Sequence, residues 1–359
     1  MSDWKKLYKK LITTLAPPGS GVFTVSAGKE KREPLHKKLY GKTEGVLEIW
    51  QETLTQLPKE KILVLGIPSD TGGGILRGAN WGPLYLREQL LSIPNLPHYL
   101  DIGDVRVVPF LLHDKYLNEE TIRKVKQSIY QDEKAPYPVS PLSITEDVCQ
   151  DIYKAFKDIR IFGIGGDHSC SYPLVKTYMM SRANQKKRAA LIHFDAHTDM
   201  LKERQGFDIC FGTWTANILE LLPSPDLCIQ IGIRDSAHPK EHWEKTFGIN
   251  QFWAKEVLED GPDKISRKII EKLKKAKVDE LYITFDLDCL DESFASATGT
   301  PAKGGLSPFE AVAIIKNLAK EIPVTGADFM ELAPHLNGNN LQTLLSSGAI
   351  ASTLIGCLK

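Results

Sequence analysis

Histidines and aspartates recur at short spacings in three segments of the chain, and these side chains could bind divalent cations. The segments are 165–169 (GGDHS), 195–199 (DAHTD) and 286–288 (DLD). Alternate side chains of an extended segment point the same way, so the members of each segment can converge on one point. Carboxylates clustered in this way would repel one another without cations between them. The residues that we expect to bind metal are His168, Asp195, His197, Asp199, Asp286 and Asp288.

This donor set favours two divalent cations over one structural zinc. Oxygen donors with some nitrogen suit Mn²⁺, with Ni²⁺ or another divalent ion as alternatives, whereas structural zinc favours thiolates and imidazoles. A carboxylate can bridge two ions about 3.5–4 Å apart, and water between them loses a proton near neutral pH. We therefore predict two Mn²⁺ per chain and a metal-bridging hydroxide as nucleophile. A single Asp-x-Asp would more often be a turn or a cap, but the three segments together favour metal.

The chain resembles the ureohydrolase family, which includes arginases, agmatinases and formimidoylglutamases. The resemblance covers residues 60–357 and implies an arginase-like fold and a binuclear manganese enzyme. Such an enzyme hydrolyses guanidino or amidino carbon–nitrogen bonds, and its binuclear site would use the six residues named above. The matching segments are 164–169 (IGGDHS), 193–199 (HFDAHTD), 284–291 (TFDLDCLD), 297–301 (ATGTP) and 326–331 (GADFME).

The resemblance also implies roles for residues around the metals. Glu331 falls where the family places the carboxylate that pairs with the substrate's guanidinium group, and a carboxylate matches a planar forked cation bidentately. We expect Glu331 and Asp199 to be catalytic. Asp199 or Asp288 would pass a proton to the leaving amine. Thr300 and Phe211, together with Glu331, are expected to bind the substrate.

One departure from the family pattern concerns proton transfer. Phe211 precedes Gly212 where arginases and agmatinases carry a histidine that is thought to shuttle protons. Formimidoylglutamases also lack that histidine. His238 or His242 could replace it, or both could be ordinary surface histidines.

A second departure concerns the substrate's tail. Residues 202–207 (KERQGF) replace the Ser-Gly-Asn loop with which arginases recognise the α-amino acid end, and Ala237 replaces an aspartate that serves the same purpose. Arginine is therefore not the expected substrate. We predict an agmatinase-like hydrolase of another guanidino or amidino compound. The alternatives are a formimidoylglutamase-type hydrolase and a metal-binding family member with impaired catalysis.

Short apolar runs alternate with helix-length segments from residue 61 onward. Such runs are typical of parallel strands buried on both faces, with functional residues at their carboxyl ends. We predict a single three-layer α/β/α domain with a mostly parallel sheet. It would occupy residues 59–359, preceded by an N-terminal extension, 1–58, that packs on the core or on a neighbouring subunit. Expected strands are 62–67, 159–164, 189–194, 227–233, 281–285 and 324–329, and expected helices are 46–57, 119–130, 145–158, 171–180, 262–275 and 309–319.

Composition excludes several partners and suggests a compartment. The formal net charge is zero, which offers no support for binding nucleic acid or an anionic membrane. No apolar run approaches the ~18–20 residues of a membrane span. The six cysteines lack C-x-x-C spacing and are expected to be reduced thiols. We expect a cytoplasmic protein, and the resemblance implies a homo-oligomer, either a trimer or a hexamer, that acts on a small molecule.

Overall fold

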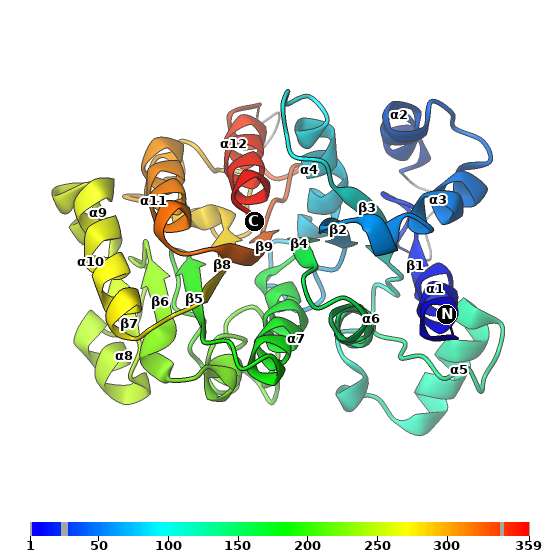
Figure 1. Cartoon of the computed structure of the whole chain (residues 1–359), viewed down its shortest axis with the longest axis horizontal. Coiled ribbons are helices and arrows are strands. Elements are labelled where there is room, and N and C mark those ends of the chain that lie inside the picture. The colour runs from blue at the N-terminus through cyan, green and yellow to red at the C-terminus, as the bar shows by residue number, and fades with distance from the viewer. Residues whose placement is uncertain (1, 23–27, 338–340, 359) are drawn as a thin grey trace.

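The computed structural model describes residues 2–22, 28–337 and 341–358. Within these residues, nine strands form a single sheet in the order β1-β3-β2-β4-β9-β8-β5-β6-β7 (Figure 1). The first pair, β1 with β3, is antiparallel, and the other neighbouring pairs are parallel. The strands are β1 (Leu15–Ala16), β2 (Ile62–Ile67), β3 (Leu100–Val105), β4 (Arg160–Gly165), β5 (Ala189–Phe194), β6 (Cys228–Ile231), β7 (Asn250–Phe252), β8 (Glu280–Asp286) and β9 (Val324–Met330).

Helices cover both faces of this sheet, which gives the predicted three layers (Figure 1). One apolar core lies between the sheet and α4, α9, α10, α11 and α12, and a second lies between the sheet and α1, α3, α6 and α7. The helices are α1 (Ser2–Thr14), α2 (Lys29–Tyr40), α3 (Val46–Leu54), α4 (Gly82–Leu90), α5 (Glu119–Tyr130), α6 (Pro141–Ala155), α7 (Ser171–Asn184), α8 (Lys240–Phe247), α9 (Ala254–Asp260), α10 (Pro262–Lys275), α11 (Pro308–Glu321) and α12 (Leu341–Cys357).

Strand β2 shows why continuous apolar runs form this sheet. Val64 points into one core, while Leu63 and Leu65 point into the other. A strand that is buried on both faces needs apolar side chains at every position, because successive side chains alternate between the faces.

Four expected elements have the predicted bounds, and the other expected elements differ only at their ends. The four are β2, β5, α5 and α10.

The strand order determines where the functional residues meet. Strands β4, β9, β8 and β5 lie side by side at the centre of the sheet and run in the same direction. Their carboxyl ends therefore lie at one edge of the sheet. The three histidine- and aspartate-rich segments follow, or end, three of these strands.

The described elements of residues 1–58 contact the rest of the chain, and a strand and a helix illustrate this. β1 pairs with β3, and Nζ of Lys10 in α1 forms ion pairs with Asp147 and Asp151 of α6, at 2.8 and 2.5 Å. The domain boundary at residue 58 remains a prediction.

The sequence analysis missed β1, β3 and β7. Among the described helices, none combines the length and the apolar character that crossing a bilayer requires.

Candidate metal centre

The carboxyl ends of β4, β5 and β8 deliver the predicted metal-binding residues. His168 begins a short 3₁₀ turn after β4, and the side chain of Asp167 caps this turn by accepting from the amide of Ser169 at 2.9 Å. Asp195 directly follows β5. Asp286 ends β8, and its side chain caps the next turn. Short 3₁₀ turns therefore follow β4 and β8, and an irregular segment follows β5, all at the carboxyl edge of the sheet.

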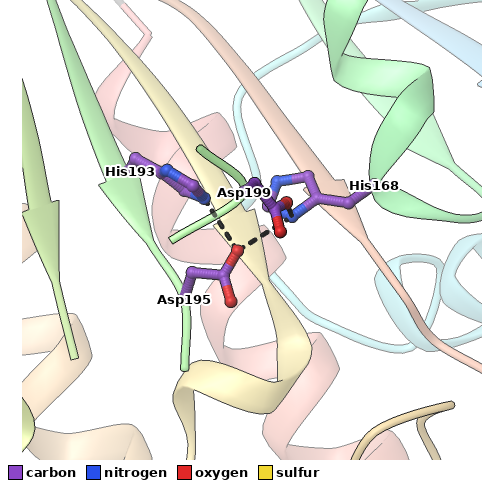
Figure 2. A group of neighbouring side chains, drawn as sticks. All are labelled: His168, His193, Asp195 and Asp199. Carbon is purple, nitrogen blue, oxygen red and sulfur yellow. Dashed lines mark hydrogen bonds and ion pairs between the residues drawn. The ribbon is translucent and has the colours of Figure 1, made fainter. Parts of the chain in front are cut away.

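His168 faces three carboxylates in the first of two groups. Its Nδ1 lies 3.1 Å from Oδ2 of Asp195 and 3.2 Å from Oδ2 of Asp199. It also lies 3.0 Å from Oδ2 of Asp286. All four side chains are buried, and this Nδ1 has no hydrogen-bond partner of acceptable geometry. Figure 2 shows three of these side chains, with His193, gathered around Asp195.

A hydrogen-bond network behind His168 leaves Nδ1 as the ligand atom. The carboxylate of Asp328 accepts from Thr284 at 2.6 Å and from Tyr282 at 2.8 Å. It also accepts from Ser171 at 3.1 Å. Because Thr284 gives its proton to Asp328, its oxygen accepts from Nε2 of His168, 3.1 Å away. The lone pair on Nδ1 then points at the carboxylate oxygens, an arrangement that is repulsive unless a cation lies among them.

Asp195 links this group to a second one. Nδ1 of His197 lies 3.0 Å from Oδ2 of Asp288 and 3.5 Å from Oδ1 of Asp195. Asp195 thus presents Oδ2 to His168 and Oδ1 to His197. The side chain of His197 is 27% exposed, whereas those of Asp195 and Asp288 are 1% exposed. One carboxylate shared by two groups of ligands is the arrangement that binuclear metal sites use.

The structure adds His193, which the sequence analysis did not identify as a site residue. Its Nε2 lies 2.8 Å from Oδ2 of Asp195, and its Nδ1 lies 3.0 Å from Nε2 of Gln230. Two hydrogen bonds orient the side-chain amide of Gln230. Its Nε2 donates to the carbonyl of Thr198, and its Oε1 accepts from Nε2 of Gln251. Nδ1 of His193 is therefore an acceptor, and Nε2–H donates to Asp195. His193 therefore orients the carboxylate of a candidate metal ligand and has no lone pair aimed at the cluster.

Asp199 and Glu331 have left-handed backbone conformations, which residues other than glycine rarely adopt. Their φ angles are 51° and 66°. Oδ2 of Asp199 accepts from Nε1 of Trp214 at 2.9 Å, and Oε1 of Glu331 accepts from the amide of His168 at 2.9 Å. Left-handed conformations of this kind cost of order 1–3 kcal/mol and concentrate at functional sites.

Within the described residues, the negative charges of the carboxylates in this cluster are not balanced by fixed positive charges of neighbouring side chains. Burial lowers the pKa of His168, but the neighbouring carboxylates of Asp195, Asp199 and Asp286 raise it well above its usual value. Burial, with the charges of Asp288 and Asp195, raises the pKa of Asp286 well above its ordinary range. The cluster attracts protons for the same reason that it would attract divalent ions. The donor set and its electrostatics therefore fit a pair of metal ions.

The other predicted residues lie around this cluster. The hydroxyl of Thr300 donates to Oδ2 of Asp288 at 2.9 Å, so Thr300 orients a candidate ligand. Phe211 is half-buried, and its amide donates to the carbonyl of Gly72 at 3.0 Å. Cys289 is buried and its thiol faces the carbonyl of Ile231 at 3.5 Å, away from a ligand role. All six cysteines are free and buried.

Several known proteins are similar to this chain. An agmatinase from Neisseria meningitidis serogroup C is 37% identical over 196 residues, which is 55% of this chain and 59% of that protein's length. An agmatinase from Chromobacterium violaceum is 29% identical over 320 residues, which cover 87% of each chain. The structure of proclavaminate amidino hydrolase from Streptomyces clavuligerus shares the fold, with a TM-score of 0.64, 24% identity, and coverage of 83% of this chain and 91% of that one. The model of the Arginase family matches residues 60–356, and the chain therefore belongs to the Arginase family.

Proposed function

We propose that this protein is an agmatinase-like hydrolase that uses two divalent ions, Mn²⁺ by preference, to cleave a guanidino or amidino carbon–nitrogen bond. The observation that carries this proposal is the division of the Asp195 carboxylate, with Oδ2 beside His168 and Oδ1 beside His197. The six candidate ligands would hold the ions, whose chemistry would be to acidify water and so supply a nucleophile near neutral pH. The agmatinase names of the similar proteins support the same reaction class.

Glu331 would bind the planar cationic group of the substrate. Its side chain is buried, and among the described residues no lysine or arginine forms an ion pair with it. Oε1 is fixed by the amide of His168 at 2.9 Å, so the carboxylate is oriented before substrate arrives. A guanidinium or amidinium group would provide the missing positive charge, and its N–H groups match the carboxylate.

Proton transfer to the leaving amine would involve carboxylates of the site itself, because Phe211 cannot carry a proton. Asp199 and Asp288 are the candidates. Oδ2 of Asp199 accepts from Trp214, and Oδ2 of Asp288 accepts from Thr300. These donors would hold each carboxylate in place as its protonation changes. A phenyl ring at position 211 would make the mouth of the site more apolar. Ala237 would offer no partner to an α-ammonium group, so arginine is the disfavoured substrate.

The test is an activity screen with a matched pair of variants. The Mn²⁺-loaded protein is offered agmatine, 4-guanidinobutyrate, guanidine, formimidoylglutamate and arginine, and released urea, formamide and ammonia are measured. We expect turnover of a compound other than arginine, lost on chelation. Glu331→Gln should lower kcat/KM by about 2–4 kcal/mol of transition-state stabilisation without changing the metal content.

Glu259→Gln on the exposed surface of α9 serves as the control and should behave like the wild type. Formamide release from formimidoylglutamate alone would select the formimidoylglutamase alternative. Metal binding without turnover of any compound would select the catalytically impaired alternative. A best activity with arginine would contradict the specificity argument. The trimer or hexamer and the cytoplasmic location remain predictions; light scattering on the purified protein would test the former.

A further inference from the structure

We propose that Arg204 is a specificity-determining residue that binds an anionic group at the tail of the substrate. This inference rests on the proposed function, and it names the substrate class of the same site: a guanidino or amidino compound whose other end is a carboxylate. The observations that carry it are the place of Arg204, the way its loop is held, and the absence of a carboxylate partner for it among the described residues.

Arg204 lies in a loop that leaves and rejoins the metal centre. The amide of Leu201 donates to the carbonyl of Gly212 at 3.1 Å, so the loop closes two residues after Asp199. Phe211 sits at this closure, and its amide donates to the carbonyl of Gly72 at 3.0 Å. The amide of Gly72 in turn donates to Asp167 at 3.0 Å, directly before His168. Phe211 is thus flanked by two ligand-bearing segments, at the border between the buried cluster and solvent.

The guanidinium of Arg204 is held over this ring. Its Cζ lies 4.8 Å from the centroid of Phe211. The backbone of Arg204 exchanges two hydrogen bonds with Phe207, of 2.8 and 3.0 Å, across a tight turn. Gln205 and Gly206, the central residues of the turn, have φ angles of 54° and 87°, as a type I′ turn requires. A cation stacked on an aromatic ring is attracted by the ring's quadrupole, and such stacking is a common placement of arginine.

The segment around Tyr116 holds the loop from outside. The rings of Tyr116 and Phe207 pack edge to face, with centroids 4.9 Å apart. The Tyr116 hydroxyl donates to Asp208 at 2.6 Å and accepts from the amide of Ile209 at 2.9 Å. Because the turn is fixed at both ends, Arg204 loses little freedom when it binds a ligand, and preorganisation of this kind favours affinity.

The charge of Arg204 is not neutralised within the described part of the chain. Among those residues, no carboxylate forms an ion pair with Arg204. Two acidic residues share the loop: Asp208 is paired with Nζ of Lys115 at 2.5 Å, and the adjacent Glu203 is exposed and forms no ion pair with Arg204. The exposed guanidinium therefore offers its N–H groups to an outside acceptor, and a carboxylate is the group that matches its fork bidentately.

These features together describe an extended substrate. Its amidinium head would meet Glu331, its apolar spacer would lie along Phe211, and its carboxylate would meet Arg204. An ammonium tail, such as that of agmatine, would instead face a fixed positive charge. Like-charge juxtaposition of this kind discriminates against a ligand as effectively as a favourable contact selects another.

The experiment compares tails that differ only in charge. Kinetics are measured for 4-guanidinobutyrate, agmatine and butylguanidine with the wild type, Arg204→Met and Arg204→Glu, with Lys202→Met as a control that removes a neighbouring loop cation. We expect the wild type to prefer the carboxylate. Arg204→Met should lose about 10–100-fold in kcat/KM for that compound, mostly through KM, and little for butylguanidine. Arg204→Glu should turn the preference toward agmatine, and Lys202→Met should change little.

Binding is measured in parallel, by the thermal shift that each compound produces in the metal-loaded protein. If nothing is turned over but the carboxylate stabilises the wild type more than Arg204→Met, the reaction assignment fails and the role of Arg204 stands. If agmatine is the best substrate and ligand, or if Arg204→Met leaves the order of the three compounds unchanged, the role of Arg204 is wrong whatever the activity. An equal loss in Lys202→Met would also contradict it, because the effect would then be general surface charge.

Discussion

Two of the acidic clusters that are buried in the described part of the chain balance their charge in different ways. In one, Arg87 of α4 binds Asp101 and Asp104 of β3, with Nε to Oδ2 of Asp101 at 2.6 Å and Nη1 to Oδ1 of Asp104 at 2.5 Å. The exposed fractions of these side chains are only 3, 10 and 1%. Asp104 also accepts from the amide of Gly19 at 2.7 Å, which ties the N-terminal region to the sheet. A single fixed guanidinium thus pairs with both carboxylates of this cluster.

Among the described residues, no lysine or arginine forms an ion pair with the carboxylates of the candidate metal centre. Four carboxylates face the imidazoles of His168 and His197, and the hydrogen bond from Nε2 of His168 to Thr284 turns a lone pair toward them. A buried charge that lacks a partner costs several kcal/mol, so a cluster of this composition is tolerated only with an added cation. The comparison indicates that an internal cation balances the first cluster within the fold, whereas the composition of the second fits added cations.

The largest expected effect is a loss of protein stability when the cation of the first cluster is removed. Arg87→Met keeps much of the side-chain volume but leaves two buried carboxylates without their cation, so we expect a loss of about 3–5 kcal/mol in the free energy of unfolding. The loss should be the same with and without Mn²⁺. Urea unfolding measures it.

Arg123→Met is the matched control, because Arg123 forms an exposed ion pair with Glu133 at 2.6 Å. Removing an exposed pair should cost less than about 1 kcal/mol. A loss in Arg87→Met no greater than in this control would show that the buried guanidinium does not stabilise the fold.

A smaller effect is expected on the affinity for Mn²⁺ when a hydrogen-bond partner of His168 is removed. Thr284→Val keeps the shape of the side chain but removes the oxygen that accepts from His168. Because outer partners of metal-binding histidines fix the ring and its tautomer, we expect the affinity for Mn²⁺ to fall by about 10–100-fold. Competition with a chelating dye measures this affinity.

Thr325→Val is the control on the adjacent strand. Thr325 is buried and hydrogen-bonded to Tyr178 at 2.7 Å and Glu280 at 2.8 Å, away from the cluster. It should lose stability and keep its metal affinity. Equal metal affinity in the two variants would mean that Thr284 does not orient His168.

The sequence was sufficient to predict those features that depend on local pattern. Continuous apolar runs predicted β2, β5 and the other central strands, and the spacing of polar residues at their ends predicted the candidate ligands. The two-residue β1 is too short to show a sequence pattern. Strand β3 (Leu100–Val105) contains Asp101 and Asp104, which interrupt the apolar pattern, and the sequence does not show that Arg87 pairs with both of them.

The supporting residues of the metal centre could not be predicted in the same way. Thr284 and Asp328 lie on neighbouring strands, and Gln230 reaches His193 from β6. Each is an ordinary polar residue in its own segment, and only the strand order brings it to the site. One signal was available: His193 is a histidine inside an apolar strand two positions before Asp195, where successive alternate side chains share a face.

The central claim is that the second cluster binds two ions per chain, and counting them tests it most directly. The wild type and Asp195→Asn are loaded with Mn²⁺, freed of excess ion, and analysed for metal and protein in the same sample. The account predicts close to two ions per wild-type chain and a loss of metal in Asp195→Asn, because both ligand groups share that carboxylate. One ion or none in the fully loaded wild type, or two retained in Asp195→Asn, would contradict it.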